Sequence, residues 1–190
     1  MDASRFRKTI LPASLLLLLV LFSWACVPKP IVDLRLIKVT RLPASALPVA
    51  AHMGGPLTMR VEAVWKVSLR GDAGWINEVK RHELNSYATV VRCDERDFGV
   101  FSLGPYVGQV PVTYYGEGFD NYRPPSRVVQ YDVYLPETGD YRSEADFNAP
   151  MPSYDLGTQR LLLCLRIAGG AMSGAYNRSN EVRLEVGGTR

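Results

Sequence analysis

Histidine is scarce in this 190-residue chain, and the common catalytic and metal-binding motifs are missing. His52 lies in a loop rich in Ala and Gly. His82 begins a zinc-type His-Glu-x-x-His pattern, but Ser86 occupies the position of the second histidine. The segment around Ser173 lacks the first glycine of a Gly-x-Ser-x-Gly nucleophile turn, and no phosphate-binding Gly-Lys-Ser/Thr loop occurs. We therefore expect no enzyme activity, no metal site and no cofactor.

The sequence also lacks a strong excess of either charge. The first 25 residues hold three of the 22 basic residues and one of the 19 acidic ones, so the remainder carries a net charge of about +1. A nucleic-acid-binding protein usually has a pronounced basic surface, which this balance does not provide. A hydrophobic content of 47% and a charged content of 22% are ordinary for a globular protein, and the length fits one domain with an N-terminal extension.

One long apolar run is present, at residues 10–25, and a short basic segment, Arg-Phe-Arg-Lys, precedes it at residues 5–8. The run is about 16 residues long, whereas a membrane-spanning helix needs about 20. Small residues stand at Ser23 and Ala25. A basic start, a short apolar stretch and small residues before the break are typical of a signal peptide. We predict that residues 1–25 are a removable export signal.

The segment from Phe22 to Cys26 resembles the cleavage site of bacterial lipoproteins. Ala25 and Cys26 match that pattern, while Ser23 and Trp24 depart from it. The resemblance implies cleavage before Cys26 and a lipid on its sulfur, and Val27 after it implies the outer membrane. Two alternatives remain: secretion with Cys26 free or paired, and an uncleaved anchor.

Two further cysteines, Cys93 and Cys164, remain if Cys26 carries a lipid. An even pair in an oxidising compartment predicts a disulfide between them. Two buried free thiols are the alternative.

The rest of the chain shows the patterns of β-structure. Residues 26–57 are expected to form a tether that includes a first strand, and residues 58–190 a β-sandwich domain. A period of two with one apolar face indicates half-buried strands. Turn-forming clusters separate the strands predicted at residues 32–36, 59–69, 87–93, 98–103, 110–114, 129–135, 161–167 and 182–186. Residues 75–84 can instead form a short helix that packs Ile76 and Val79. The predicted fold is an all-β, antiparallel β-sandwich.

The C-terminal strands carry a second resemblance. Residues 163–167, a Gly-rich loop and residues 179–186 resemble the last hairpin of immunoglobulin-like and fibronectin type III-like domains, which implies an immunoglobulin-like sandwich. Cys164, however, shares its side of the strand with Leu162 and Arg166, opposite the apolar face. A disulfide there should lie at an edge or a bulge rather than in the core between the sheets.

Aromatic residues supply the candidate binding site. Alternation places Tyr114 and Tyr131 in the core, whereas the Gly/Pro-rich loop that follows residue 114 can expose a patch. Its members are Tyr115, Phe119, Tyr122 and Arg123. Tyrosine combines a flat apolar face with a hydrogen-bonding tip, which suits a protein interface or glycan stacking. Packing of the loop against itself is the alternative.

A second loop, residues 136–155, is rich in carboxylates: Glu137, Asp140, Glu144, Asp146 and Asp155. Such oxygens can bind Ca²⁺, but the spacing matches no EF-hand, so a polar loop is the simpler interpretation.

Taken together, the sequence predicts a non-enzymatic cell-envelope lipoprotein that binds or scaffolds an envelope protein partner. A carbohydrate- or peptidoglycan-binding module that uses the loop aromatics is the second hypothesis, and a hydrolase with an unrecognised site is the third.

Overall fold

The computed structural model describes residues 28–31, 33–48, 62–116, 118–140 and 152–188. β-Strands dominate these residues. Helical structure among them is limited to the 3-10 turn η1 (Ala44–Ala46) and the α-helix α3 (Gly74–His82). The prediction of an all-β fold is confirmed, and so is the short helix that packs Ile76 and Val79, both of which are buried.

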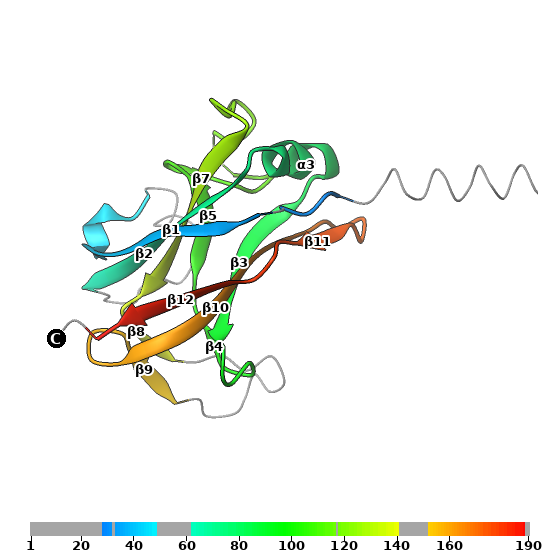
Figure 1. Ribbon diagram of the computed structural model, residues 1–190. Coiled ribbons are helices and arrows are strands. Elements are labelled where there is room, and N and C mark those ends of the chain that lie inside the picture. The colour runs from blue at the N-terminus through cyan, green and yellow to red at the C-terminus, as the bar shows by residue number, and fades with distance from the viewer. Residues whose placement is uncertain (1–27, 32, 49–61, 117, 141–151, 189–190) are drawn as a thin grey trace, which may run out of the picture.

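Five strands form the first sheet (Figure 1), in the order β1-β2-β7-β5-β6. Their bounds are β1 Arg35–Pro43, β2 Ala63–Asp72, β7 Val128–Pro136, β5 Leu103–Val107 and β6 Val110–Pro111. All neighbours in this sheet are antiparallel. The edge strand β1 contains a bulge between Leu36 and Lys38, a feature that discourages pairing with other chains.

The second sheet has β10 at its centre. One side of β10 (Arg160–Gly170) pairs with β3 (Asn85–Arg92), which in turn pairs with β4 (Gly99–Val100). The other side of β10 pairs with two strands at different positions along its length. Residues 168–170 pair with β11 (Tyr176–Arg178), and residues 160–165 pair with β12 (Val182–Gly187). A separate small pair is formed by β8 (Thr138–Asp140) and β9 (Ser153–Asp155).

The strand order is that of an immunoglobulin-like sandwich. If β1, β2, β3, β5, β7, β10 and β12 are lettered A to G, the first sheet contains A-B-E-D and the second contains C-F-G. These are the two sheets of the immunoglobulin fold. The predicted immunoglobulin-like architecture is therefore confirmed at the level of topology.

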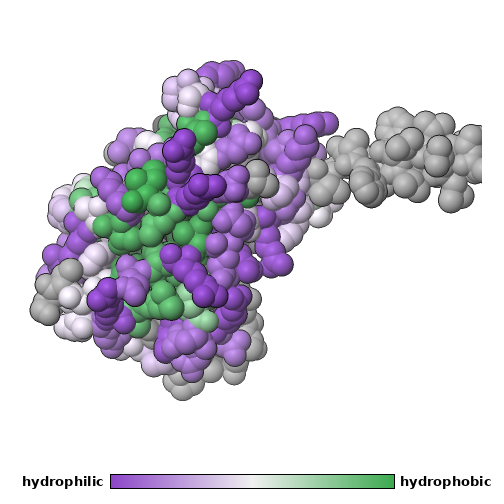
Figure 2. All heavy atoms as spheres, viewed as in Figure 1, coloured by the Kyte–Doolittle hydropathy of each residue, from purple (hydrophilic) through white to green (hydrophobic). Residues whose placement is uncertain are grey.

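The core lies between the two sheets. Inward-facing residues alternate along the strands, as the period of two predicts: Leu163, Leu165 and Ile167 from β10, and Val129, Tyr131, Val133 and Leu135 from β7 are all buried. Trp75 of α3 adds its ring at one end and donates from Nε1 to Ser86 Oγ at 3.2 Å. Figure 2 shows one face of the molecule, where apolar side chains gather in the middle with polar side chains around them.

Several predicted strand limits are wrong. The first strand begins at Arg35 rather than at residue 32, and the predicted strand at 98–103 is divided between β4 in the second sheet and β5 in the first. The break occurs because the chain crosses between the sheets there. Gly104 follows with a φ of 106°, and a Cβ on it would lie 2.8 Å from the carbonyl oxygen of Asp132. Tyr114, predicted to be in the core, is half-buried outside it.

Candidate functional site

The disulfide joins Cys93 and Cys164, as predicted. Cys93 directly follows β3, and Cys164 lies on β10 opposite Val91 of β3. The bond therefore links two neighbours within the second sheet instead of crossing between the sheets. Cys164 faces away from the core, as the strand alternation predicts, yet it is only 2% exposed. Such a bond fits an exported protein in a non-reducing compartment.

Longer side chains surround this outer face of the second sheet and leave a depression of about 410 Å³ above its centre. Its floor contains Thr89 of β3 and the buried Ala168 of β10. Tyr87 of β3 and Tyr176 of β11 line it as well and are 45% and 51% exposed. Register explains the grouping, because Ala168 pairs with Tyr87 on one side and with Arg178 on the other. We call this the tyrosine–arginine depression.

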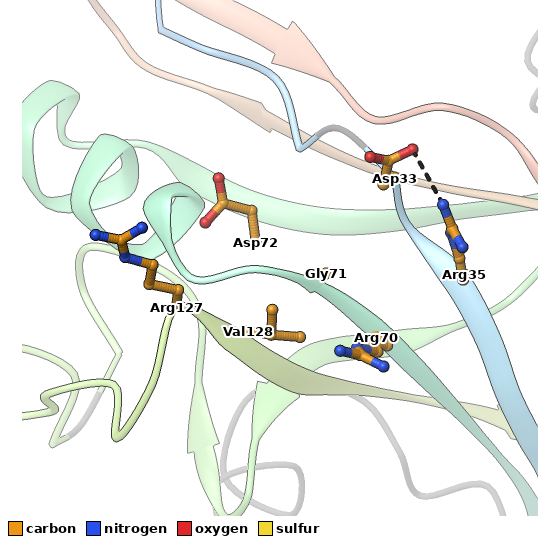
Figure 3. A pocket seen from close by; sticks show the side chains of 7 residues that line it. All are labelled: Asp33, Arg35, Arg70, Gly71, Asp72, Arg127 and Val128. Carbon is orange, nitrogen blue, oxygen red and sulfur yellow. Dashed lines mark ion pairs between the residues drawn. The ribbon is translucent and has the colours of Figure 1, made fainter.

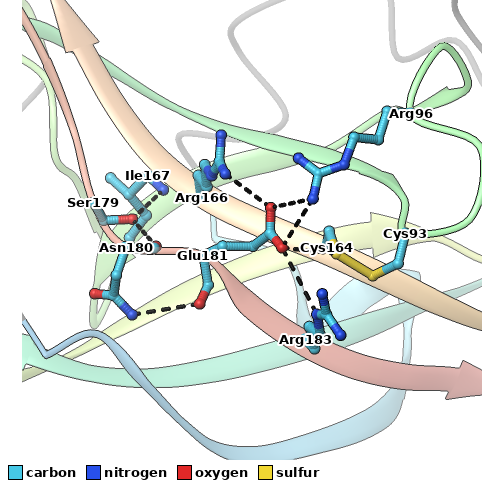
Figure 4. Close-up of polar contacts among 9 residues, drawn as sticks. All are labelled: Cys93, Arg96, Cys164, Arg166, Ile167, Ser179, Asn180, Glu181 and Arg183. Atoms are coloured by element: carbon cyan, nitrogen blue, oxygen red, sulfur yellow. Dashed lines mark hydrogen bonds and ion pairs between the residues drawn. A yellow bond between two sulfur atoms is a disulfide. The ribbon is translucent and has the colours of Figure 1, made fainter.

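One carboxylate organises the arginines at the depression (Figure 4). Glu181 precedes β12, and its side chain is 17% exposed. Its oxygens lie 2.9 Å from Arg166, 3.2 Å from Arg96 and 3.8 Å from Arg183. The Sγ of Cys164 is 3.3 Å from the same carboxylate. The disulfide and the ion pairs therefore share one cluster.

This cluster has more donors than its carboxylate can use. Three guanidiniums offer roughly fifteen N–H groups, whereas a carboxylate has roughly four lone-pair sites. Arg96 and Arg166 of this cluster line the depression, and Arg178 lines it as a third guanidinium. The N–H groups that Glu181 does not use lie beside the rings of Tyr87 and Tyr176. This surface is therefore suited to bind carboxylate groups of another molecule.

A second polar cluster lies on the outer face of the first sheet. Asp132 of β7, 3% exposed, accepts hydrogen bonds from Ser68 Oγ and Gln130 Nε2, each at 2.8 Å, and lies 2.8 Å from Lys66 Nζ. Burial disfavours the charged form of Lys66, but the hydrogen bond and the charge of Asp132 outweigh it, so the pKa of Lys66 is raised. Because Ser68 is completely buried, its hydroxyl is inaccessible to a substrate, and the cluster connects β2 to β7.

A further depression of about 490 Å³ lies where β1, β2 and β7 meet near α3 (Figure 3). Arg35, Arg70 and Arg127 line it from separate segments, together with Asp33 and Asp72. Arg35 lies 3.7 Å from Asp33, with both side chains largely exposed. Asp72 instead accepts from the backbone N–H of Gly74 at 2.8 Å. The charges are mixed and do not converge on one point, so this surface is a weaker candidate.

The aromatic patch predicted on the loop is not formed. Tyr115 is 69% exposed, but Phe119 is completely buried in the core and Tyr122 is half-buried against it. Arg123 Nη1 donates to the carbonyl of Asp120 at 2.7 Å and to that of Tyr122 at 3.0 Å. The loop folds on itself because its one fully apolar ring gains more from burial than from exposure.

Lys80 of α3 stabilises this loop from the other side. Its ammonium donates to the carbonyls of Asp120 and Tyr122 at 2.9 and 2.8 Å and lies 5.2 Å from the centre of the Phe119 ring. Burial lowers the pKa of Lys80, and the nearby charge of Arg123 acts in the same direction. Phe119, Tyr122 and Arg123 therefore serve the packing of the loop, whereas Tyr115 is exposed.

The acidic loop is only partly described. Glu137 is 2% exposed and accepts two hydrogen bonds from Arg41, from Nε at 2.9 Å and from Nη2 at 3.0 Å. Asp140 and Asp155 lie on β8 and β9, while Glu144 and Asp146 fall outside the described residues, as do His52 and Cys26. His82 lies 3.5 Å from Glu78, one turn earlier on α3. Across the described ranges, no group of three or more His, Cys, Asp or Glu side chains could hold a metal ion.

The fold is an immunoglobulin-like sandwich, and the tyrosine–arginine depression lies on the outer face of its second sheet. No protein-family model, no curated protein and no solved structure matches the chain. In the part of the chain that the structure covers, no helix has both the length and the apolar character needed to cross a membrane.

Proposed function

We propose that the protein is a non-enzymatic module of the cell envelope that binds an acidic segment of a protein partner in the tyrosine–arginine depression. A lipid on Cys26 holds it at the outer membrane. The observation that carries the binding proposal is the excess of guanidinium donors around Glu181, beside two exposed tyrosines.

The composition of the depression favours a protein partner. Tyrosine and arginine are enriched among the residues that contribute most to protein–protein binding. An arginine can bind a carboxylate through two parallel hydrogen bonds, which adds direction as well as charge. The ion pairs to Glu181 hold Arg96 and Arg166 in place before a partner arrives, which reduces the entropy lost on binding.

The anchoring proposal is supported by the N-terminal sequence and by the disulfide. A basic start, a short apolar run and Cys26 after Ala25 match the order of elements in a lipoprotein signal. The Cys93–Cys164 bond agrees with delivery to an oxidising compartment.

The glycan hypothesis loses its original support. It required the rings of Tyr115, Phe119 and Tyr122 to lie on the surface, and Phe119 is completely buried. The protein-partner hypothesis is therefore preferred.

The test is recovery of a partner from crosslinked cell envelopes of the native host, with the full chain at its natural level. Arg178→Glu reverses a charge within the depression, and Arg127→Glu makes the same change in the weaker depression on the first sheet. We expect a protein recovered with the unsubstituted chain to be retained with Arg127→Glu and largely lost with Arg178→Glu. Equal recovery with both variants would contradict the proposal. Retention of the disulfide and of the thermal unfolding midpoint establishes that both variants are folded.

A further inference from the structure

The described chain begins at one end of the sandwich, beside α3 and β11, while its last strand, β12, ends at the opposite end, near β8 and β9 (Figure 1). Pro28 is buried, and its carbonyl accepts a hydrogen bond from Asn177 Nδ2. The backbone N–H of Lys29 donates to Glu78 Oε2 of α3 at 2.8 Å. The chain is therefore fastened to this end of the domain from its first described residues.

Only a short stretch of chain separates this attached segment from the proposed lipid. Cys26 precedes Pro28 by two residues, and two extended residues span at most about 7 Å. A lipid on Cys26 would hold the α3–β11 end at the height of the lipid headgroups. The apolar run at residues 10–25 would have the same effect if it stayed attached and entered the bilayer.

The surface at this end carries the groups that such a position favours. Met172, in the turn between β10 and β11, is 98% exposed, and the nearby Tyr176 is 51% exposed. A depression of about 660 Å³ separates this turn from the end of α3, and Arg81 lines it. An apolar tip, an amphipathic ring and a basic side chain together are typical of surfaces that lie in the membrane interface.

The charges at this end only partly cancel. Glu83 lines the same depression, whereas the carboxylate of Glu78 already accepts from the Lys29 backbone and lies 3.5 Å from His82. The exposed basic side chains of Lys29, Arg81 and Arg178 outnumber these two carboxylates by one, and anionic lipids attract such a surface.

From the chain path and this surface, we infer that the α3–β11 end docks on a phospholipid bilayer, with Met172 entering the headgroup region. The inference rests on the membrane attachment proposed above. The long axis of β10 then points away from the bilayer, and Leu162, ten residues before Met172 in the sequence, lies about 30 Å farther out.

The test compares two exposed apolar positions, one on β10 and one in the turn that follows it. Met172→Cys and Leu162→Cys are made in the full chain, which is purified with its membrane attachment and placed in vesicles of phosphatidylethanolamine and phosphatidylglycerol. A thiol-specific fluorophore reports quenching by a lipid that carries a spin label at the headgroup. The unsubstituted chain supplies the background from Cys26, and peptide mass mapping checks that Cys93 and Cys164 remain paired.

We expect quenching to be several-fold stronger at residue 172 than at residue 162. Equal quenching at both positions in a chain that is bound to the vesicles would overturn the docking surface and leave the anchor proposal intact. A chain that does not associate with vesicles at all would overturn the anchor and the docking together. The partner-binding proposal is tested separately by photo-crosslinking from residue 89, which lines the tyrosine–arginine depression and is not part of the docking surface.

Discussion

The Cys93–Cys164 disulfide closes a loop with a sequence separation of 71 residues. The loop includes β4, β5, β6, β7, β8 and β9 and thus most of the chain between the two central strands of the second sheet. A cross-link of this length removes about 15 cal/mol/K of entropy from the unfolded chain, or about 4 kcal/mol at 25 °C. Reduction of the bond should therefore lower the free energy of unfolding by about that amount.

The assay is guanidinium chloride unfolding followed by the fluorescence of Trp65 and Trp75, which are 6% and 2% exposed. Cys26→Ser leaves Cys93 and Cys164 as the only cysteines. Unfolding of this variant is measured with the disulfide intact and after its reduction. Reduction retains both sulfur atoms, so the comparison separates the cross-link from packing.

Reduction should also raise the dependence of the unfolding free energy on denaturant concentration, because the unfolded chain expands further without the cross-link. The Cys93→Ala/Cys164→Ala double variant should lose at least as much stability as the reduced chain, since it also removes packed sulfur atoms. A difference between the oxidised and reduced chains below about 1 kcal/mol would refute the loop-entropy reasoning.

Two further predictions concern the backbone and the pH dependence. Gly187→Ala should lower the free energy of unfolding by about 3 kcal/mol or more, because φ is 97° and the new Cβ would overlap the carbonyl oxygens of Leu156 and Gln159. Gly174 has a similar φ of 83° but open space around it, so Gly174→Ala should lower the free energy of unfolding by only about 1 kcal/mol. Similar midpoints in thermal unfolding would count against this. Burial raises the pKa of Tyr131, whose hydroxyl donates a hydrogen bond to the carbonyl oxygen of Asp72 at 2.6 Å. Above pH about 10, therefore, this tyrosine ionises only in the unfolded state. The free energy of unfolding then falls as the pH rises, by up to about 1.4 kcal/mol per pH unit. Tyr131→Phe should make this alkaline decline shallower in unfolding measurements between about pH 8 and 11, and an unchanged slope would be the opposing result.

Strands with strong alternation were predictable from the sequence because burial itself imposes the period. Leu163, Leu165 and Ile167 are alternate residues of β10 and all face the core. Cys164 lies between two of them in the sequence, so it must face the opposite side of the strand. The loop that holds Phe119 has no such period, and its glycines and prolines give no indication of which side chains turn inward. The prediction of an exposed ring therefore failed there.

The tyrosine–arginine depression could not be predicted from local patterns. Arg96, Arg166 and Arg183 come from three separate segments and meet at Glu181 only through strand pairing, with Cys164 opposite both Val91 and Arg183. Each arginine alone looks like an ordinary solvated charge. Only the register of β3, β10 and β12 shows that their guanidiniums outnumber the acceptors nearby.

Site-specific photo-crosslinking in living cells tests partner binding most directly. A photoreactive residue replaces Thr89, on the floor of the tyrosine–arginine depression, and in a matched variant it replaces the exposed Thr138 of β8. We predict that residue 89 crosslinks to one envelope protein through an acidic segment of that protein, and that residue 138 does not. Absence of a crosslink from residue 89, or the same products from both positions, would contradict the proposed binding surface.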